Sequence, residues 1–197
     1  MNYDGLLSYD PKKGIEDYAA DKVRAKILQI KQLTGQDRIL LIGHSMGGMV
    51  AGCYAERYAE KDGVKIEHVV TIASPWQGSP LVDRFMLGPD APKRYHQMST
   101  SSGFREDLVA QALHSERTNA RNYYSIGSKA DIQVPGSVSI LSEDPRRQRL
   151  FSSMGHYGIV ASPRVWSQIR SWLDAIYTQE PAAASCAKES RQVPAYA

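Results

Sequence analysis

The chain has little cysteine, no long apolar run and no strong excess of charge of one sign. Two cysteines stand among 197 residues, and no zinc-binding spacing of cysteine and histidine accompanies them, so neither a disulfide scaffold nor a metal site is expected. No stretch is long and apolar enough to span a bilayer, and residues 1–10 have neither the basic start nor the apolar core of a secretory signal. We therefore expect a cytoplasmic protein without stable membrane insertion.

The charge of the chain is mildly basic and dispersed, with a net value of +3. The densest cationic cluster is Arg146, Arg147 and Arg149, which follows two acidic residues and a proline. That arrangement is typical of a solvated turn rather than of a phosphate site. We expect no nucleic-acid partner, and the sequence carries no indication of oligomeric state. With 42% hydrophobic residues, the chain can form one domain with a buried sheet.

Apolar periodicity predicts strands that alternate with helices. Helical patterns run over 11–35, 46–63 and 162–177, and short apolar runs that read as strands cover 39–42, 66–73 and 123–126. This alternation favours parallel strands in an α/β sandwich, and the continuous apolar run Ile39 to Ile42 indicates a strand buried on both faces. We expect one domain over 1–177, followed by a flexible tail over 178–197.

A longer excursion, residues 81–121, separates the second and third predicted strands. Its middle is polar and rich in serine, and it contains one amphipathic helix through Phe104, Leu108, Val109 and Leu113. Two interpretations stand side by side. The segment is either a lid over the mouth of a site or a surface helical hairpin with no gating role.

The most informative motif is Gly-His-Ser-Met-Gly-Gly at residues 43–48, between the strand 39–42 and the following helix. It is a nucleophile elbow, a sharp turn that presents the hydroxyl of Ser45 to a substrate. Gly43 and Gly47 lack the Cβ atoms that would collide where strand and helix meet, and Gly48 lets the helix start against the sheet. The backbone NH of Met46 is the candidate oxyanion donor.

A serine nucleophile needs a base and a group that orients the base. In this kind of fold the partners follow the serine in the order acid, then histidine, on loops after later strands. Asp131 lies just after the strand 123–126, and His156 lies in a loop with glycines on both sides before the last helix. Asp83 and Asp144 are the rival acids, and Asp131 is favoured by its position after a strand.

The other histidines are weaker candidates for the base. His44 belongs to the elbow, His68 falls inside a predicted strand, and His96 and His114 belong to the excursion. We expect structural roles for them, with His44 also a candidate substrate-binding residue.

The chain resembles the lipase branch of the α/β hydrolases, including bacterial lipase-like proteins and inositol deacylases that act on glycosylphosphatidylinositol anchors. The resemblance covers most of residues 2–173. It rests on the elbow 42–48, on Thr-Ile-Ala-Ser-Pro-Trp-Gln-Gly-Ser-Pro at 71–80, on the Asp131 loop and on Gly-His-Tyr-Gly at 155–158. It implies a parallel-sheet sandwich with a helical lid and no cofactor. Relatives commonly have histidine where Trp76 stands, so we expect Trp76 to line the substrate pocket.

The front of the chain departs from this family pattern. Relatives have an earlier strand that ends in a His-Gly turn, which supplies the second oxyanion donor, and no such turn precedes the helix at 11–35. Asn2, Tyr3 and Asp4 look like the end of a preceding strand. We therefore expect a sheet without the first strands and a chain that begins partway into the domain.

These residues predict a serine hydrolase that cleaves carboxylic esters, either small-molecule or lipid, through an acyl-enzyme on Ser45. Three alternatives stay open. A thioesterase or amidase uses the same triad, and an inactive remnant would serve as a binding domain. A lipid-surface binding protein would need an exposed apolar lid, against which the serine-rich middle of the excursion argues.

Overall fold

The computed structural model describes residues 10–178, and its centre is a four-stranded parallel sheet. The strands lie in the order β1 (Leu41–His44), β2 (His68–Ile72), β3 (Asn122–Ser128) and β4 (Gln148–Phe151). All neighbouring pairs are parallel. The carboxyl ends of all four strands therefore meet at one edge of the sheet, and the loops that follow them lie close together.

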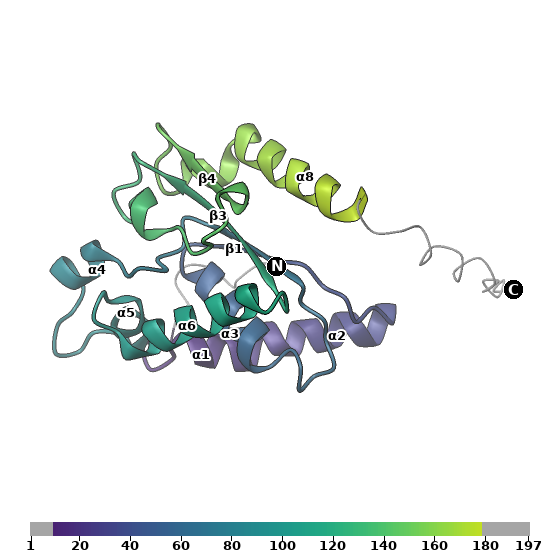
Figure 1. Cartoon of the computed structure of the whole chain (residues 1–197). Helices are drawn as coiled ribbons and strands as arrows, with labels where there is room; N and C mark the ends of the chain where they lie inside the picture. The colour runs from purple at the N-terminus through teal and green to yellow at the C-terminus, as the bar shows by residue number, and fades with distance from the viewer. Residues whose placement is uncertain (1–9, 179–197) are drawn as a thin grey trace, which may run out of the picture.

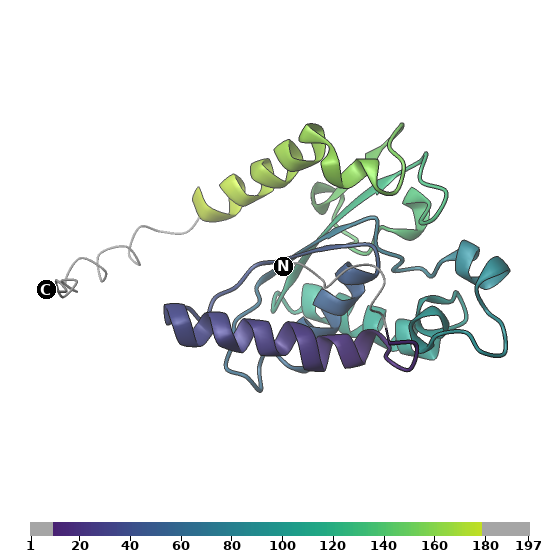
Figure 2. The ribbon, with the colours of Figure 1, turned by 180° about the vertical axis from the view of Figure 1, so that it is seen from behind.

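Helices cover both faces of the sheet, as the prediction of an α/β sandwich requires (Figures 1 and 2). On one face lie α1 (Ile15–Tyr18), a π-helical turn (Ala19–Val23), α2 (Arg24–Thr34), α3 (Met46–Arg57) and α6 (Gly103–Arg117). On the other lies α8 (Pro163–Thr178), preceded by the single turn α7 (Gly158–Ala161). The helix expected over 11–35 begins only at Ile15, and it ends at Gly35, where a φ of 68° suits glycine.

Each layer has its own apolar core. The larger core joins α1, α2, α3 and α6 to the sheet and includes fully buried Ile15, Met49 and Leu108. The smaller core lies under α8, where Ile169 and Trp172 pack against strand residues of β2 and β3. Because a core packs against each face of the sheet, the strand ends that carry the site are held in fixed positions.

The excursion at 81–121 contains three helices rather than one. The short helices α4 (Pro80–Phe85) and α5 (Lys93–Met98) precede α6, which is the helix that the apolar spacing predicts. Leu108 and Ala112 of α6 are fully buried against the main core. The second half of the segment is thus part of the helical layer, and only α4 and α5 stand beside the edge of the sheet that carries the loops (Figure 1).

One expectation about the strands was wrong, and one strand was missed. Ile42 is 41% exposed, so β1 is not buried on both faces, because β1 is an edge strand of the described sheet and α8 lies over its other strands. The strand β4 was not predicted at all. Its burial pattern places Arg149 and Leu150 in solvent and only Phe151 in the core, so the apolar signal is too short to mark a strand.

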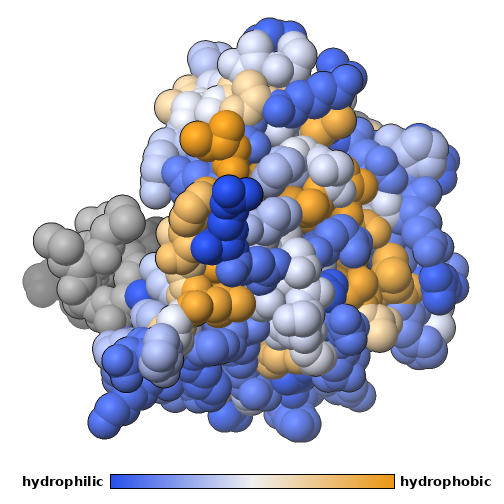
Figure 3. Space-filling view, turned by 90° about the vertical axis from the view of Figure 1, so that its left-hand side faces the viewer, coloured by the Kyte–Doolittle hydropathy of each residue, from blue (hydrophilic) through white to orange (hydrophobic). Residues whose placement is uncertain are grey.

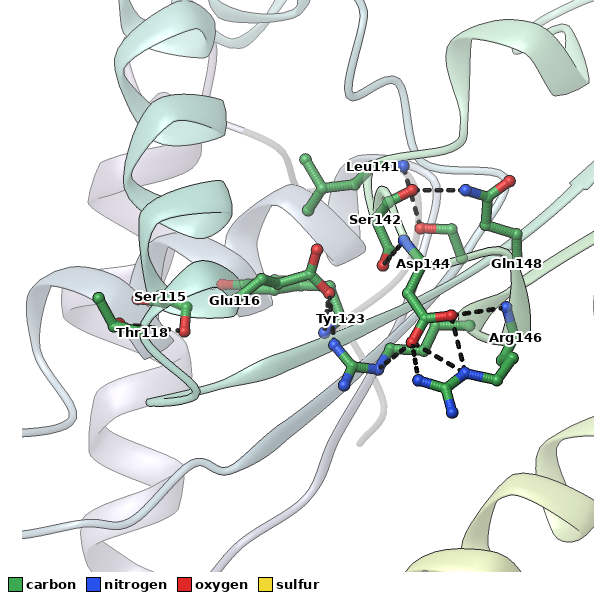
Figure 4. Close-up of polar contacts among 11 residues, drawn as sticks. Ser115, Glu116, Thr118, Tyr123, Leu141, Ser142, Asp144, Arg146 and Gln148 are labelled. Carbon is green, nitrogen blue, oxygen red and sulfur yellow. Dashed lines mark hydrogen bonds and ion pairs between the residues drawn. The ribbon is translucent and has the colours of Figure 1, made fainter.

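The predicted solvated turn at residues 143–149 is a connected polar structure (Figure 4). Asp144 caps a 3-10 turn (Pro145–Arg147) by accepting from the backbone NH of Arg146 at 2.9 Å, and its carboxylate also accepts from both Nε and Nη2 of the Arg146 guanidinium. Gln148 donates to the carbonyl of Ser142 at 2.6 Å. These contacts fix the entry to β4, at the opposite end of the sheet from the carboxyl ends.

Between residues 10 and 178 no helix has both the length and the apolar character needed to cross a bilayer. The predicted tail at 178–197 lies outside the described residues except for Thr178, which ends α8.

Candidate active site

Ser45 occupies a sharp turn between β1 and α3. Its backbone has φ 55° and ψ −132°, a region that residues other than glycine rarely adopt. The turn is held because the NH of Ser45 donates to the carbonyl of Ile72 at 2.8 Å, one step beyond the paired strands. A Cβ atom on Gly43 would lie 2.5 Å from the carbonyl oxygen of Gly47. Only glycine fits at position 43, as the elbow motif predicts.

The structure brings Ser45, His156 and Asp131 into one chain of hydrogen bonds. The Nε2 atom of His156 lies 2.9 Å from Oγ of Ser45, and its Nδ1 atom lies 2.7 Å from Oδ2 of Asp131. A carboxylate can only accept, so Nδ1 carries the hydrogen and Nε2 is left to accept from the serine hydroxyl. This is the tautomer that a general base needs.

Asp131 is fixed more tightly than a surface carboxylate. It is 1% exposed, and its Oδ1 atom accepts from the backbone NH groups of Gln133 and Val134, both at 2.9 Å. These two bonds leave Oδ2 facing His156. The loop after β3 therefore orients the carboxylate before any substrate binds.

The rival residues lie elsewhere. Asp83 is bonded to the NH and hydroxyl of Thr100, and Asp144 is bonded to Arg146. His68 begins β2, and the two histidines of the excursion lie in α5 and α6. Cys53 is fully buried in α3, and burial raises the pKa of its thiol to about 12, so it offers no thiolate nucleophile.

Met46 is the first residue of α3, so its NH has no acceptor within the helix. It stands directly after Ser45 at the positive end of the helix dipole, where an oxyanion is stabilised. The expected strand end at Asn2, Tyr3 and Asp4 lies outside the described residues.

A cavity of about 260 Å³ opens beside Ser45 and His156. Its wall is mostly apolar, and the described side chains that form it include Met46, Val82, Met86, Met98, Val134 and Tyr157. None of these except Met46 was singled out from the sequence, because the segments that meet at the cavity are far apart in the chain. The spacing of apolar residues within each segment does not show which ones face a site.

Large apolar side chains are exposed next to the cavity. Phe85 is 70% exposed, Ile132 82% and Tyr157 63%. Tyr157 lines the cavity itself, Phe85 directly precedes the cavity-lining Met86, and Ile132 directly precedes the cavity-lining Gln133. The face of the molecule that carries α4 and α5 shows apolar patches among polar side chains (Figure 3). The serine-rich stretch therefore does not make this side of the protein uniformly polar.

The structure places Trp76 differently from the expectation. Its side chain is fully buried, its Nε1 donates to Oγ1 of Thr71 at 3.1 Å, and its ring meets Tyr123 edge-on. The indole thus belongs to the core, because its one polar atom finds a partner there. The preceding Pro75 lines the cavity in its place.

His44 also does not line the cavity. It is half-buried at the end of β1, and its Nε2 atom lies 2.9 Å from the backbone carbonyl oxygen of His156. Its expected role as a substrate-binding residue is therefore not matched by its position. Among residues 10–178, no three His, Cys, Asp or Glu side chains are grouped closely enough to hold a metal ion.

Comparisons with known proteins agree with this architecture. The family model described as alpha/beta hydrolase fold matches residues 7–127. No curated protein sequence matches the chain. Among solved structures, the mature form of the lipase BlEst2 from Bacillus licheniformis is similar with a TM-score of 0.61 at 17% identity, over 83% of this chain and 76% of that one.

The phospholipase PlaB from Legionella pneumophila, solved in complex with thio-NAD, is similar with a TM-score of 0.55 at 16% identity. The match covers 70% of this chain and 35% of PlaB, so the chain spans about a third of that relative's length. At these identities the likeness shows the fold alone. Together with the family model, the parallel sheet and the strand-to-helix turn at Ser45, it establishes that the chain belongs to the α/β hydrolase fold family.

Proposed function

We propose that the protein is a serine hydrolase that cleaves carboxylic esters through an acyl-enzyme. The observation that carries the proposal is the continuous chain from the Ser45 hydroxyl through His156 to the buried carboxylate of Asp131. Serine is a weak nucleophile at neutral pH, and this arrangement supplies both a base and its orienting group.

Each group has one task in the reaction. Oγ of Ser45 attacks the ester carbonyl while Nε2 of His156 takes its proton, and the NH of Met46 donates to the oxyanion. His156 then returns the proton to the alcohol oxygen as the carbon–oxygen bond breaks, which leaves an ester on Ser45. Water, activated by the same imidazole, attacks this ester and releases the acid and the free serine.

The cavity favours an ester with an apolar acyl chain. Three methionines and two valines contribute to its wall, and such side chains adapt to chains of different shape. The cavity-lining Met86 and Tyr157 are themselves 37% and 63% exposed, so apolar surface continues outward from the wall. Both small-molecule and lipid esters fit this description, and the lipase and phospholipase among the structural neighbours are consistent with it.

An activity-based probe tests the proposal directly. A fluorophosphonate should label the wild-type protein and leave Ser45→Ala unlabelled, while His114→Ala, an exposed change in α6, should leave labelling intact. A panel of matched acyl esters, thioesters and amides then identifies the bond cleaved. Equal labelling of wild type and Ser45→Ala would refute the nucleophile. A folded wild-type protein that neither labels nor cleaves any of these compounds would favour the inactive binding domain.

A further inference from the structure

The loop that carries His156 is packed at Met154 and at the buried imidazole, and it is open around its glycines. It connects β4 to α7, and the glycines on both sides of it, Gly155 and Gly158, have open space where a Cβ atom would stand. The neighbouring Tyr157 is 63% exposed. Around the glycines no packing fixes the main chain, so specific hydrogen bonds help to hold the imidazole in position.

Two of those bonds anchor the backbone of the loop. The NH of Met154 donates to Oγ of Ser128, at the end of β3, at 3.0 Å. The second is the contact at 2.9 Å between Nε2 of His44 and the carbonyl oxygen of His156. A carbonyl oxygen only accepts, so Nε2 of His44 carries the hydrogen and donates it.

His44 and Ser45 are consecutive residues, and one binds the main chain of His156 while the other binds its side chain. Ser45 meets the imidazole at Nε2, and His44 meets the main chain of the same residue. Both come from the rigid end of β1 at the elbow. Any shift of the loop away from the sheet would stretch both bonds together. The elbow therefore presents the nucleophile and also sets the distance between Ser45 and the imidazole of His156.

We propose that His44 is a positioning residue that sets the reach of His156 to Ser45 through its hydrogen bond to the His156 backbone. The inference rests on the proposed function in that His156 is the general base. This positioning role differs from the expected substrate-binding role, because the His44 side chain is directed at the loop and is not part of the cavity wall.

The charge state of His44 fits this task. Its ring centre lies 4.7 Å from that of His156. Burial lowers the pKa of His44, and the nearby imidazole of His156 lowers it further. A neutral His44 keeps its hydrogen-bond donor without placing a second positive charge beside the imidazolium that forms on His156 during acyl transfer.

A matched pair of substitutions separates the effect of the hydrogen-bond donor of His44 from the effect of the size of its side chain. His44→Gln carries an NH₂ group at a reach similar to that of Nε2, whereas His44→Met has a similar length and no donor. We expect H44M to lower kcat for ester hydrolysis by roughly ten- to a hundredfold, because small misplacements of a base are costly. The KM should stay within about twofold, since His44 does not touch the cavity, and H44Q should recover most of the lost kcat. The exposed change His114→Met is the control.

Nuclear magnetic resonance gives a readout independent of turnover. The Nδ1 hydrogen of His156, bonded to Asp131, should appear as a low-field proton signal in wild type and H44Q and be broadened or lost in H44M. Wild-type kcat with an unchanged proton signal in H44M would overturn the proposal, as would equal losses in H44M and H44Q. If wild-type protein hydrolyses no ester, the proposed function fails, and the proton signals alone still decide whether His44 positions the loop.

Discussion

The indole of Trp76 lies directly against Gly52 in the middle of α3, and a Cβ atom on Gly52 would stand 2.6 Å from the ring's Cη2 atom. Glycine in a helix interior is normally unfavourable, by about 1 kcal/mol relative to alanine. Here it makes room for the largest fully buried side chain of the core. The contact explains why α3 contains this glycine beyond those the elbow requires.

We expect Gly52→Ala to destabilise the protein despite the better helix propensity of alanine. The indole is fully buried, bonded to Thr71 and edge-on to Tyr123, so making room for the added methyl disturbs these contacts, and overpacking of this kind costs about 1–3 kcal/mol. Thermal and urea unfolding measure the change. Gly103→Ala at the start of α6 is the matched control, because no atom lies within 4 Å of its added Cβ. Equal stability of Gly52→Ala and wild type would contradict the packing described for Trp76.

The second prediction concerns the acid of the triad. In Asp131→Asn, the amide oxygen can still accept from the NH groups of Gln133 and Val134, and this turns the amide nitrogen toward His156. The imidazole must then carry its hydrogen on Nε2, where it can no longer accept a proton from Ser45. We expect kcat to fall by a factor on the order of 10⁴, as for the same change in another serine hydrolase, without loss of folding.

The controls for this change are the two rival acids. Asp83→Asn and Asp144→Asn should keep kcat near the wild-type value, since both carboxylates are bonded away from the site. A larger loss of kcat in either control than in Asp131→Asn would show that the acid had been assigned to the wrong residue.

Much of this architecture could be predicted from the sequence, because the decisive signals are local. The elbow shows in six consecutive residues, and the order of the first three strands and of the long helices follows from apolar spacing. Asp131 could be found because it follows a predicted strand and parallel strands place their following loops at one edge. His156 could be found from the order of acid and histidine and from its loop between glycines before the last helix. Those inferences need no knowledge of which side chains touch.

The features that could not be predicted depend on contacts between distant segments. Trp76 is buried because Gly52 leaves space for its ring and Thr71 accepts the hydrogen bond of its indole NH. The contact between His44 and the His156 loop joins residues 112 positions apart. The strand β4 is formed through its pairing with β3, because its own residues are largely polar or exposed and give no apolar signal long enough to mark a strand.

The third prediction is a pH dependence of stability that arises at Asp144. The hydrogen bond from Arg146 holds the pKa of this carboxyl at about 2, below its ordinary value of 3.8. A depressed pKa means that the ionised form is favoured in the folded state. The stabilisation is therefore present above the ordinary value and is lost as the pH falls through the folded-state pKa.

Asp144→Asn removes this contribution. The difference in melting temperature between wild type and the variant should be largest above pH 4 and should shrink as the pH falls toward 2, and added salt should reduce it because Arg146 is exposed. Thermal unfolding without added denaturant, measured between pH 6 and pH 2.5, checks the trend. A difference that stays constant over this range would mean that the ion pair contributes nothing specific.

The last prediction tests the apolar mouth of the cavity. Met86 lines the cavity next to exposed Phe85 and is 37% exposed itself, so Met86→Glu should fold normally while placing a charge where an acyl chain would lie. The cost should grow with chain length: KM for an octanoate ester should rise about five- to tenfold, equivalent to ~1 kcal/mol of lost apolar contact, and KM for an acetate ester should hardly change. Leu33→Glu, on a 76% exposed position of α2, is the control for an added surface charge. Equal effects of Met86→Glu on both esters would place the acyl chain outside this cavity, whereas a chain-length dependence confined to Met86→Glu would identify the cavity as the acyl site.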